Sequence, residues 1–258
     1  MGTLDGRRAL ITGSGRGIGR ATALAFAREG ATVVVSARTG SQVESVVAEI
    51  NAAGGRAVGF TADVDDDESV TSLQQRVAQE LDGPVDILIS NAGIYMARRF
   101  ADYTMDEWQR MLSVNVLGAV RVIRAFLPSM LERGEGRVLI VASTAGKWGS
   151  LYQSAYNVSK HALIGLTRCL ALETASRGVR VNALCPGWVE TGMIDTAELA
   201  GAYQVPEDDV RRTLLQRVPI GRMVTPDEVA ALAVYLASPL ADAMTGQSIT
   251  LAGGMLLI

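Results

Sequence analysis

Short runs of β-branched and aliphatic residues alternate along this chain with longer stretches of helical periodicity. The short runs are almost continuously apolar, which is typical of strands buried on both faces of a sheet. In the stretches between them, apolar residues recur three and four positions apart, which predicts amphipathic helices. The predicted strands span residues 7–12, 31–37, 56–62, 85–90, 136–143, 179–185 and 246–253.

This alternation predicts an α/β fold in which a doubly wound parallel sheet carries helices on both faces. The pattern continues from residue 7 to about residue 252 without a repeat or a linker rich in Pro, Gly or Ser. We therefore expect a single domain over residues 1–258.

The longest departure from the rhythm falls at residues 191–222, which read as one or two short helices. Long insertions in compact domains are usually binding loops or lids. The segment is predicted to be a substrate lid. A helical excursion that only packs against the body is the alternative.

Composition excludes several functional classes. The 258 residues are 48% hydrophobic and carry a net charge of −3, so a broad basic surface for nucleic acid is not expected. Cys169 and Cys185 are too few for a disulfide framework, and neither belongs to a motif with metal-ligand spacing. Both lie among apolar residues, which predicts buried thiols, and no metal site is expected.

Targeting and membrane signals are also missing from the pattern. The first residues contain no apolar segment like that of a signal peptide. No uninterrupted apolar run approaches the roughly 20 residues of a membrane span. We expect no membrane partner and a cytoplasmic location.

A glycine-rich loop follows the first predicted strand in the stretch "ITGSGRGIGRA". Such a loop turns backbone N–H groups and a helix N-terminus toward an anion, with no Cβ in the way. The G-x-G-x-x-G spacing fails in every register. The spacing that fits is T-G-x-x-x-G-x-G, at Thr12, Gly13, Gly17 and Gly19.

This spacing resembles that of the short-chain dehydrogenase/reductase family, and further matches follow in the family's order. They are "ADV" at 62–64, "NAG" at 91–93, Asn115 in "NVLG", Ser143 in "VAS", Tyr156-x-x-x-Lys160 and "CPGWVET" at 185–191. A lone glycine loop is a weak signal, but this ordered set covers essentially the whole chain. The resemblance implies a Rossmann fold with a seven-stranded sheet and a dinucleotide lying across the carboxyl ends of its strands.

The resemblance also implies which residues bind the dinucleotide. They are Gly13, Ser14, Gly15, Arg16, Gly17, Ile18, Gly19, Ala37, Arg38, Asp63, Val64, Asn91, Ala92, Gly93, Tyr156, Lys160, Pro186, Gly187, Val189 and Thr191. Thr191 would contact the nicotinamide carboxamide.

Charge at the end of the second strand favours NADP(H) over NAD(H). An NAD site usually has an acid there for the ribose 2′-hydroxyl, whereas this chain has Ala37 followed by Arg38. With Arg16, this makes two guanidiniums, which suit a 2′-phosphate. The alternative is that both arginines are ordinary surface charges.

Tyr156 and Lys160 are four residues apart on a predicted helix and therefore share a face. A nearby ammonium favours phenolate and typically lowers a tyrosine pKa by about 1–3 units. By resemblance, Tyr156 exchanges a proton with the substrate oxygen and Ser143 hydrogen-bonds that oxygen. Asn115 would hold a water that relays protons toward Lys160. His161, the only histidine, is interpreted as structural.

The residues around the expected substrate pocket are mostly apolar, with a few polar groups. Similar family members act on β-ketoacyl and polyketide-like chains, which predicts a ketoreductase whose ketone or alcohol substrate is presented as a thioester on CoA or a carrier protein. Arg98 and Arg99 would offer charge to its phosphate, or are solvated surface residues. The predicted pocket residues are Tyr95, Ala145, Trp148, Tyr152, Trp188 and Met193; several of them alternatively pack into lid or subunit contacts.

Two other functions stay open from the sequence. The first is a secondary-alcohol dehydrogenase for cyclic, steroid-like or hydroxyacyl substrates. The second is a non-catalytic NADP(H) sensor, although such proteins usually lose the tyrosine, serine or lysine. Family members are expected to be homotetramers. The predicted helices over 105–131 and 154–175 carry more apolar residues than one face needs, which suits a subunit interface.

Overall fold

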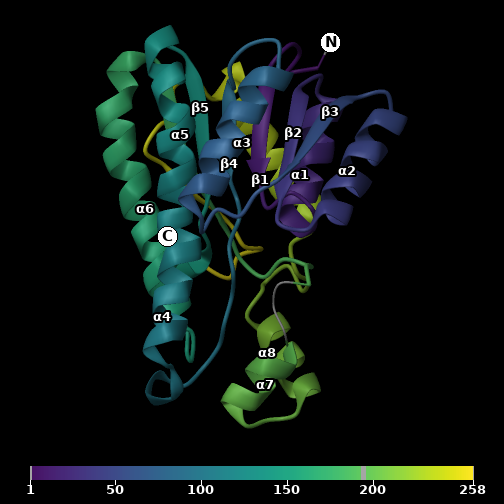
Figure 1. Ribbon diagram of the computed structural model, residues 1–258. Coiled ribbons are helices and arrows are strands. Elements are labelled where there is room, and N and C mark those ends of the chain that lie inside the picture. The colour runs from purple at the N-terminus through teal and green to yellow at the C-terminus, as the bar shows by residue number, and fades with distance from the viewer. Residues whose placement is uncertain (1, 193–195, 258) are drawn as a thin grey trace.

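The computed structural model describes residues 2–192 and 196–257. Over these residues the strands form a parallel seven-stranded sheet in the order β3-β2-β1-β4-β5-β6-β7 (Figure 1). The fold class predicted from the sequence is confirmed. The strands are β1 Arg8–Thr12, β2 Thr32–Ala37, β3 Arg56–Thr61, β4 Ile87–Ser90, β5 Gly136–Val141, β6 Val179–Pro186 and β7 Ser248–Leu251.

Each central strand is apolar on both faces because each face is covered by helices. In β1, Leu10 joins the core on one face of the sheet. Its neighbours Ala9 and Ile11 join the core on the other. All three are fully buried. The near-continuous apolar runs of the sequence therefore follow from burial on both sides.

The helices divide between the two faces. Helices α1 Gly17–Arg28, α2 Gly40–Ala52 and α9 Pro226–Ala237 pack on the Ile11 face. The Leu10 face is covered by α3 Asp67–Glu80, α5 Gly118–Arg133 and α6 Ser154–Thr174.

Strand order places the site. β1 pairs with β2 on one side and β4 on the other, so successive crossovers leave β1 in opposite directions. A crevice forms at such a switch point, outside the carboxyl ends of the strands. The loops that follow β1, β4, β5 and β6 all open toward it.

One long helical stretch runs over Met105–Arg133. It consists of α4 Met105–Leu112, a π-helical turn Ser113–Leu117 and α5. By length and composition alone this helix could cross a membrane. This differs from the sequence-based expectation of no membrane span, which counted only uninterrupted apolar runs. Its residues Val122, Ile123 and Phe126 are buried in the core under the sheet, so we interpret it as a core helix.

Two short helices, α7 Thr196–Tyr203 and α8 Glu207–Gln216, project from the body beyond the carboxyl ends of the strands (Figure 1). They confirm the expected helical insertion. Met193, predicted to line the substrate pocket, lies outside the described residues. We call α7 and α8 the lid segment, after the role predicted from the sequence for residues 191–222.

The prediction for the cysteines is half right. Cys185 on β6 is buried, whereas Cys169 on α6 is exposed. The reason is that α6 has apolar residues on more than one side, so an apolar neighbourhood in the sequence does not establish burial.

Candidate active site

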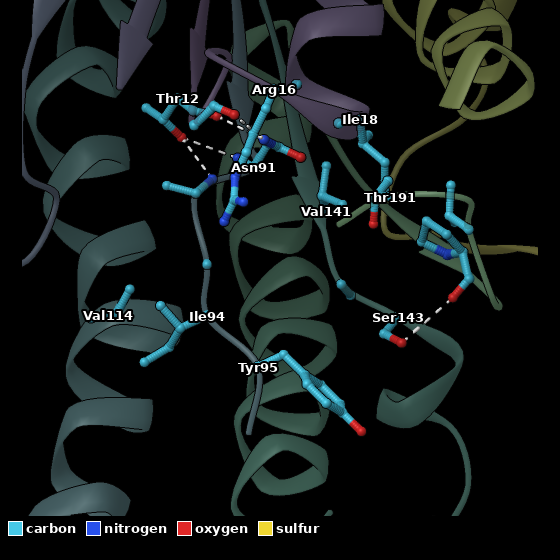
Figure 2. Close-up of a pocket in the computed structure, with 18 of the residues that line it drawn as sticks. Thr12, Arg16, Ile18, Asn91, Ile94, Tyr95, Val114, Val141, Ser143 and Thr191 are labelled. Atoms are coloured by element: carbon cyan, nitrogen blue, oxygen red, sulfur yellow. Dashed lines mark hydrogen bonds between the residues drawn. The ribbon is translucent and has the colours of Figure 1, made fainter. Parts of the chain in front are cut away.

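A cavity of about 500 Å³ opens at the carboxyl ends of the strands. Its volume is typical of sites for small molecules and cofactors. Figure 2 shows Thr12 and Asn91 near one end and Ser143 and Tyr95 near the other. Most of the predicted site residues line it: Gly13, Gly15, Arg16, Gly17, Ile18, Gly19, Ala37, Arg38, Asp63, Val64, Asn91, Ala92, Gly93, Tyr95, Ser143, Ala145, Trp148, Tyr156, Lys160, Pro186, Gly187, Trp188, Val189 and Thr191.

The loop between β1 and α1 needs its glycines. Gly13 and Gly17 have φ of 65° and 56°, a region that L-residues with a Cβ rarely adopt. A Cβ on Gly19 would lie 2.6 Å from Asn91 Nδ2 and 2.8 Å from Ser14 Cα. The loop therefore presents backbone and the start of α1 to the cavity, an arrangement that fits a phosphate.

The loop after β4 is fastened to the glycine loop. Asn91 Nδ2 donates to the carbonyl oxygens of Thr12, at 2.9 Å, and Gly13, at 3.1 Å (Figure 2). Thr12 Oγ1 in turn accepts from the backbone N–H groups of Asn91 and Ala92. We did not single out Thr12 for this role, although it is the first residue of the T-G-x-x-x-G-x-G spacing.

Ser14 departs from its predicted role. It does not line the cavity and is fully buried. Its hydroxyl donates to the Ile11 carbonyl at 2.7 Å and accepts from the Ser36 N–H at 2.9 Å. Ser14 thus ties β1 to β2 beneath the loop, although it stands inside the glycine motif.

The end of β2 is positively charged. Arg16 and Arg38 both line the cavity and are exposed. Among the described residues, neither guanidinium has an ion-pair partner, whereas several other arginines of the chain do. Thr39 and Gln42 line the same region and were not predicted. Two unpaired guanidiniums beside Ala37 fit an additional phosphate group better than a ribose hydroxyl.

Three reactive side chains meet at the other end. Ser143 follows β5, and Tyr156 lies in the first turn of α6, with Lys160 one turn later. Lys160 Nζ is buried, donates to the Val141 carbonyl at 2.9 Å and lies 5.6 Å from the centre of the Tyr156 ring. Ser143 Oγ accepts from the Ala145 N–H at 3.1 Å, which fixes the turn that carries it.

Burial dominates the electrostatics of this group. Desolvation raises the pKa of Tyr156 to about 12, and a hydrogen bond with Ser143 opposes this by lowering it. Desolvation also lowers the pKa of Lys160 to about 8, against a weaker raising effect of Cys185. The expected depression of the tyrosine pKa by lysine is therefore wrong for the chain by itself. Loss of water destabilises the phenolate, and the Lys160 ammonium donates its hydrogen bond to the Val141 carbonyl.

Asn115 is placed differently from expectation. It lies in the π-helical turn, is buried and does not line the cavity. Its Oδ1 accepts from the Ile94 N–H at 2.8 Å, and its Nδ2 donates to the Ile94 carbonyl and to Ser159 Oγ, each at 3.0 Å. The side chain holds the loop after β4 against α6, so its amide is engaged with protein groups rather than free for water.

His161, which the sequence interpretation kept structural, donates through Nδ1 to the Asn157 carbonyl at 2.9 Å. This bond lies within α6, one turn back along the helix. It leaves the ring without a part in the cavity, since His161 is not among the cavity residues.

The predicted substrate residues separate into two groups. Tyr95, Ala145, Trp148 and Trp188 line the cavity, and the Tyr95 ring meets the Tyr156 ring edge to face at 5.1 Å. Tyr152 does not line it. Its ring contacts Tyr203 of α7 at 4.9 Å, with the Arg99 guanidinium 5.9 Å from its centre.

Arg98 is engaged elsewhere in the protein. It pairs with Glu198 of α7 at 2.5 Å and lies 3.6 Å from Glu107. Two carboxylates therefore already compensate its charge, and Arg98 is neither free for a phosphate nor a solvated surface residue. The sequence could not reveal this, because Glu198 is a hundred residues away.

Further cavity residues were not anticipated. Most are apolar or small residues next to a predicted motif, and proximity to that motif was the available signal. Met255 comes from the far C-terminal segment and had no such signal. Thr12 and Ala62 belong to matched motifs but were not named as site residues; the others are Ser36, Thr39, Gln42, Ile94, Val114, Val141, Ala142, Thr144, Ser150, Gln153, Gly192 and Met255.

Comparison with known proteins agrees with this geometry. A family model described as enoyl-(acyl carrier protein) reductase matches residues 13–256. The 3-oxoacyl-(acyl-carrier-protein) reductase FabG of Thermotoga maritima is 35% identical, covering 98% of this chain and 99% of that protein. The D-beta-hydroxybutyrate dehydrogenase of Cupriavidus necator is 38% identical, covering 97% and 98%.

A solved structure is similar throughout. The chain aligns with a variant of actinorhodin polyketide ketoreductase, solved with NADPH, at a TM-score of 0.93 and 38% identity, with 99% of both chains covered. Sequence and fold thus agree over almost the full length of both chains. The chain belongs to the short-chain dehydrogenase/reductase family.

Proposed function

We propose that this protein is an NADP(H)-dependent ketoreductase that transfers hydride between the nicotinamide and a ketone or secondary alcohol. The observation that carries the proposal is one continuous cavity. At one end it has a phosphate-binding glycine loop and two unpaired guanidiniums, and at the other Ser143, Tyr156 and Lys160.

The roles follow from the groups present. The nicotinamide supplies the hydride when it is bound. Tyr156, whose pKa is raised to about 12, stays protonated at neutral pH and donates its proton to the carbonyl oxygen during reduction. Ser143 hydrogen-bonds the same oxygen and orients the substrate. Lys160 adds a positive charge behind the phenol, and Asn115 positions the loop that borders both.

We assign Arg16 and Arg38 to the 2′-phosphate of NADP(H). Both border the cavity beside Ala37, and the Ala37 side chain offers no acceptor for a ribose hydroxyl. The glycine loop, Asp63, Val64, the segment Asn91–Gly93 and the segment after β6 up to Thr191 would hold the rest of the dinucleotide. Ser14 is left out of this assignment.

For the substrate we favour a β-ketoacyl or polyketide-like chain. The actinorhodin ketoreductase and the 3-oxoacyl reductase support this class. The 3-hydroxybutyrate dehydrogenase supports the alternative of a dehydrogenase for hydroxyacyl substrates. Of the two arginines considered for a thioester phosphate, Arg99 remains, since it lies against Tyr152 near the lid segment rather than in an ion pair with a described carboxylate.

The test is oxidation of NADPH with a small panel of carbonyl compounds. An acetoacetyl thioester, a cyclic ketone, a bicyclic decalone and a steroid ketone separate the substrate classes. We expect fastest turnover with the acetoacetyl thioester. Faster oxidation of the matching 3-hydroxyacyl compound with NADP⁺ would favour the dehydrogenase instead. Tight NADPH binding without turnover of any carbonyl would restore the sensor function.

We further propose a homotetramer that works in the cytoplasm. Several large apolar side chains on α4 to α6 are exposed in the single chain and would be covered by another subunit. They include Met105, Val158 and Leu172, exposed by 69%, 48% and 84%. Light scattering that finds only monomers at micromolar concentration would contradict this assembly.

A further inference from the structure

A carboxylate of the lid segment binds two groups of the body. Glu198 in the first turn of α7 accepts from Arg98 Nη1 at 2.5 Å and from the Ala97 N–H at 3.3 Å. Arg98 and Ala97 belong to the loop after β4. The pair is only partly exposed, with 22% of the Glu198 side chain and 38% of the Arg98 side chain accessible. Partial burial and a second donor make it stronger than an isolated surface ion pair.

Apolar and aromatic contacts reinforce this attachment. Leu199, the next residue of α7, is fully buried in a small cluster with Ala97. Tyr203 at the end of α7 meets the Tyr152 ring edge to face at 4.9 Å. Tyr152 adopts φ of 62°, a strained conformation for a residue with a side chain, and its carbonyl accepts from the Arg98 N–H at 2.8 Å.

The same loop reaches the proton donor. Tyr95 lies two residues before Ala97 and packs against the cluster of Ala97 and Leu199, which we call the lid cluster. Its ring meets the Tyr156 ring edge to face at 5.1 Å. A displacement of α7 that pulled on Arg98 would therefore act on the neighbours of the Tyr156 phenol. Lid position and proton-donor position are linked through one short stretch of chain.

Two buried polar atoms oppose the packing of α7 against the body. Tyr95 Oη and Trp188 Nε1 are buried without a hydrogen-bond partner among the described residues, and both side chains pack against the lid cluster. A buried donor without a partner destabilises the state that buries it, and opening the lid would return both atoms to water. Burial of Tyr95 also raises its pKa, so it stays a neutral phenol.

We infer that Arg98 and Glu198 are positioning residues for the proposed reduction, holding α7 against the loop after β4 at the substrate end of the cavity, and that the buried Tyr95 hydroxyl counteracts them. The equilibrium between attached and detached α7 is then set by two opposing effects. The Arg98–Glu198 ion pair stabilises the attached state, and burial of the Tyr95 hydroxyl destabilises it. Substitutions at the two places should shift this equilibrium in opposite directions. The kinetic consequence rests on the proposed function, whereas the lid equilibrium itself does not.

Amide hydrogen exchange of α7, measured on the full chain without substrate, tests the lid directly. E198Q keeps the shape of the side chain but removes its charge, and exchange over Thr196–Tyr203 should become about fivefold faster. Y95F keeps the ring and its packing but removes the hydroxyl, and the same amides should exchange about tenfold more slowly.

D209N is the matched control. Asp209 forms an ion pair with Arg212 inside α8, so this variant also neutralises a paired acid of the lid segment without touching the body. Exchange over α7 should stay as in the parent protein. If E198Q leaves α7 exchange unchanged, or if Y95F accelerates it as E198Q does, the inference is wrong.

Turnover provides the second readout. For a ketone that the enzyme reduces, E198Q should raise KM several-fold and Y95F should lower it, while NADPH affinity stays constant in both. Opposite shifts in KM would not follow from a merely structural role, which predicts losses of the same sign. If no ketone is reduced, the proposed function fails. The exchange experiment still decides whether Arg98 and Glu198 hold α7 against the body.

Discussion

The two ends of the cavity are built from different kinds of contact. At the glycine-loop end, the contacts join backbone groups to short side chains, as in the bonds of Asn91 and Thr12. At the lid end they join long side chains, as in Arg98 with Glu198 or Tyr152 with Tyr203.

This difference decides what each end tolerates. At the glycine-loop end, positive φ angles and close approach of neighbouring backbone atoms allow only one residue type at some positions. This end therefore forms a sequence motif with fixed spacing. At the lid end, many different pairs of long side chains can make similar contacts, so the residues there can vary while the shape is kept. We expect the first end to bind what the whole family binds and the second to select the substrate.

The largest effect is expected at the junction of the two ends. Tyr156→Phe removes the proton donor and keeps the ring, and kcat should fall by about a thousandfold. NADPH binding, followed by its fluorescence, should persist because the glycine-loop end is untouched. Near-parental turnover would show that the proton comes from another group.

Reversing charge at the glycine-loop end should change cofactor choice. Arg38→Asp replaces a phosphate partner with a carboxylate, and the preference for NADPH over NADH in kcat/KM should fall by about 10- to 100-fold. Arg28→Asp, an exposed charge in the last turn of α1, is the control and should leave the preference unchanged. A clear NADPH preference in Arg38→Asp would refute the assignment of Arg38.

The same small substitution should separate the two ends in stability. A Cβ on Gly19 would meet Asn91 Nδ2 at 2.6 Å, so Gly19→Ala should lower the free energy of unfolding by about 1–3 kcal/mol. A Cβ on Gly201 of α7 meets nothing within 4 Å, and Gly201→Ala should raise it by up to about 1 kcal/mol. Urea unfolding measures both. Equal losses would contradict the contrast between the ends.

A dependence on pH is expected through Lys160. Its pKa in the folded chain is lowered to about 8, whereas an unfolded lysine titrates near 10.4. The folded state therefore disfavours the ammonium, and the free energy of unfolding should rise as the pH increases from about 8 to about 10.4. Reduction should slow as the pH rises through about 8, where Lys160 in the folded enzyme loses the charge beside Tyr156.

Urea unfolding measured between about pH 8 and about pH 10.4, and turnover measured on both sides of about pH 8, check this dependence. Lys160→Met should flatten the stability profile, because the group that titrates is gone. A profile that keeps its slope in Lys160→Met would assign the dependence to another residue.

Predictions from the sequence succeeded where physical constraints act within a short segment. Burial on both faces makes the strands almost continuously apolar, and the turn after β1 requires glycine at Gly13 and Gly17. Ser14 shows the limit of such predictions. It stands inside the glycine motif, yet its side chain points into the core and bonds to β1 and β2 instead of lining the cavity. The Tyr156 pKa was misjudged for a related reason: spacing shows a neighbouring charge but not the loss of water.

The sequence by itself therefore determined the parallel α/β fold and the glycine loop, since local sterics and burial periodicity specify them. Ser143, Tyr156 and Lys160 were found in the sequence through resemblance to the family. Only the tertiary structure decided that Arg98 is paired with Glu198, that the Asn115 amide holds a loop, and that Tyr95 and Trp188 bury polar atoms under α7. These contacts join segments far apart in the chain, and long side chains that meet only in the folded state leave no periodic or spaced pattern.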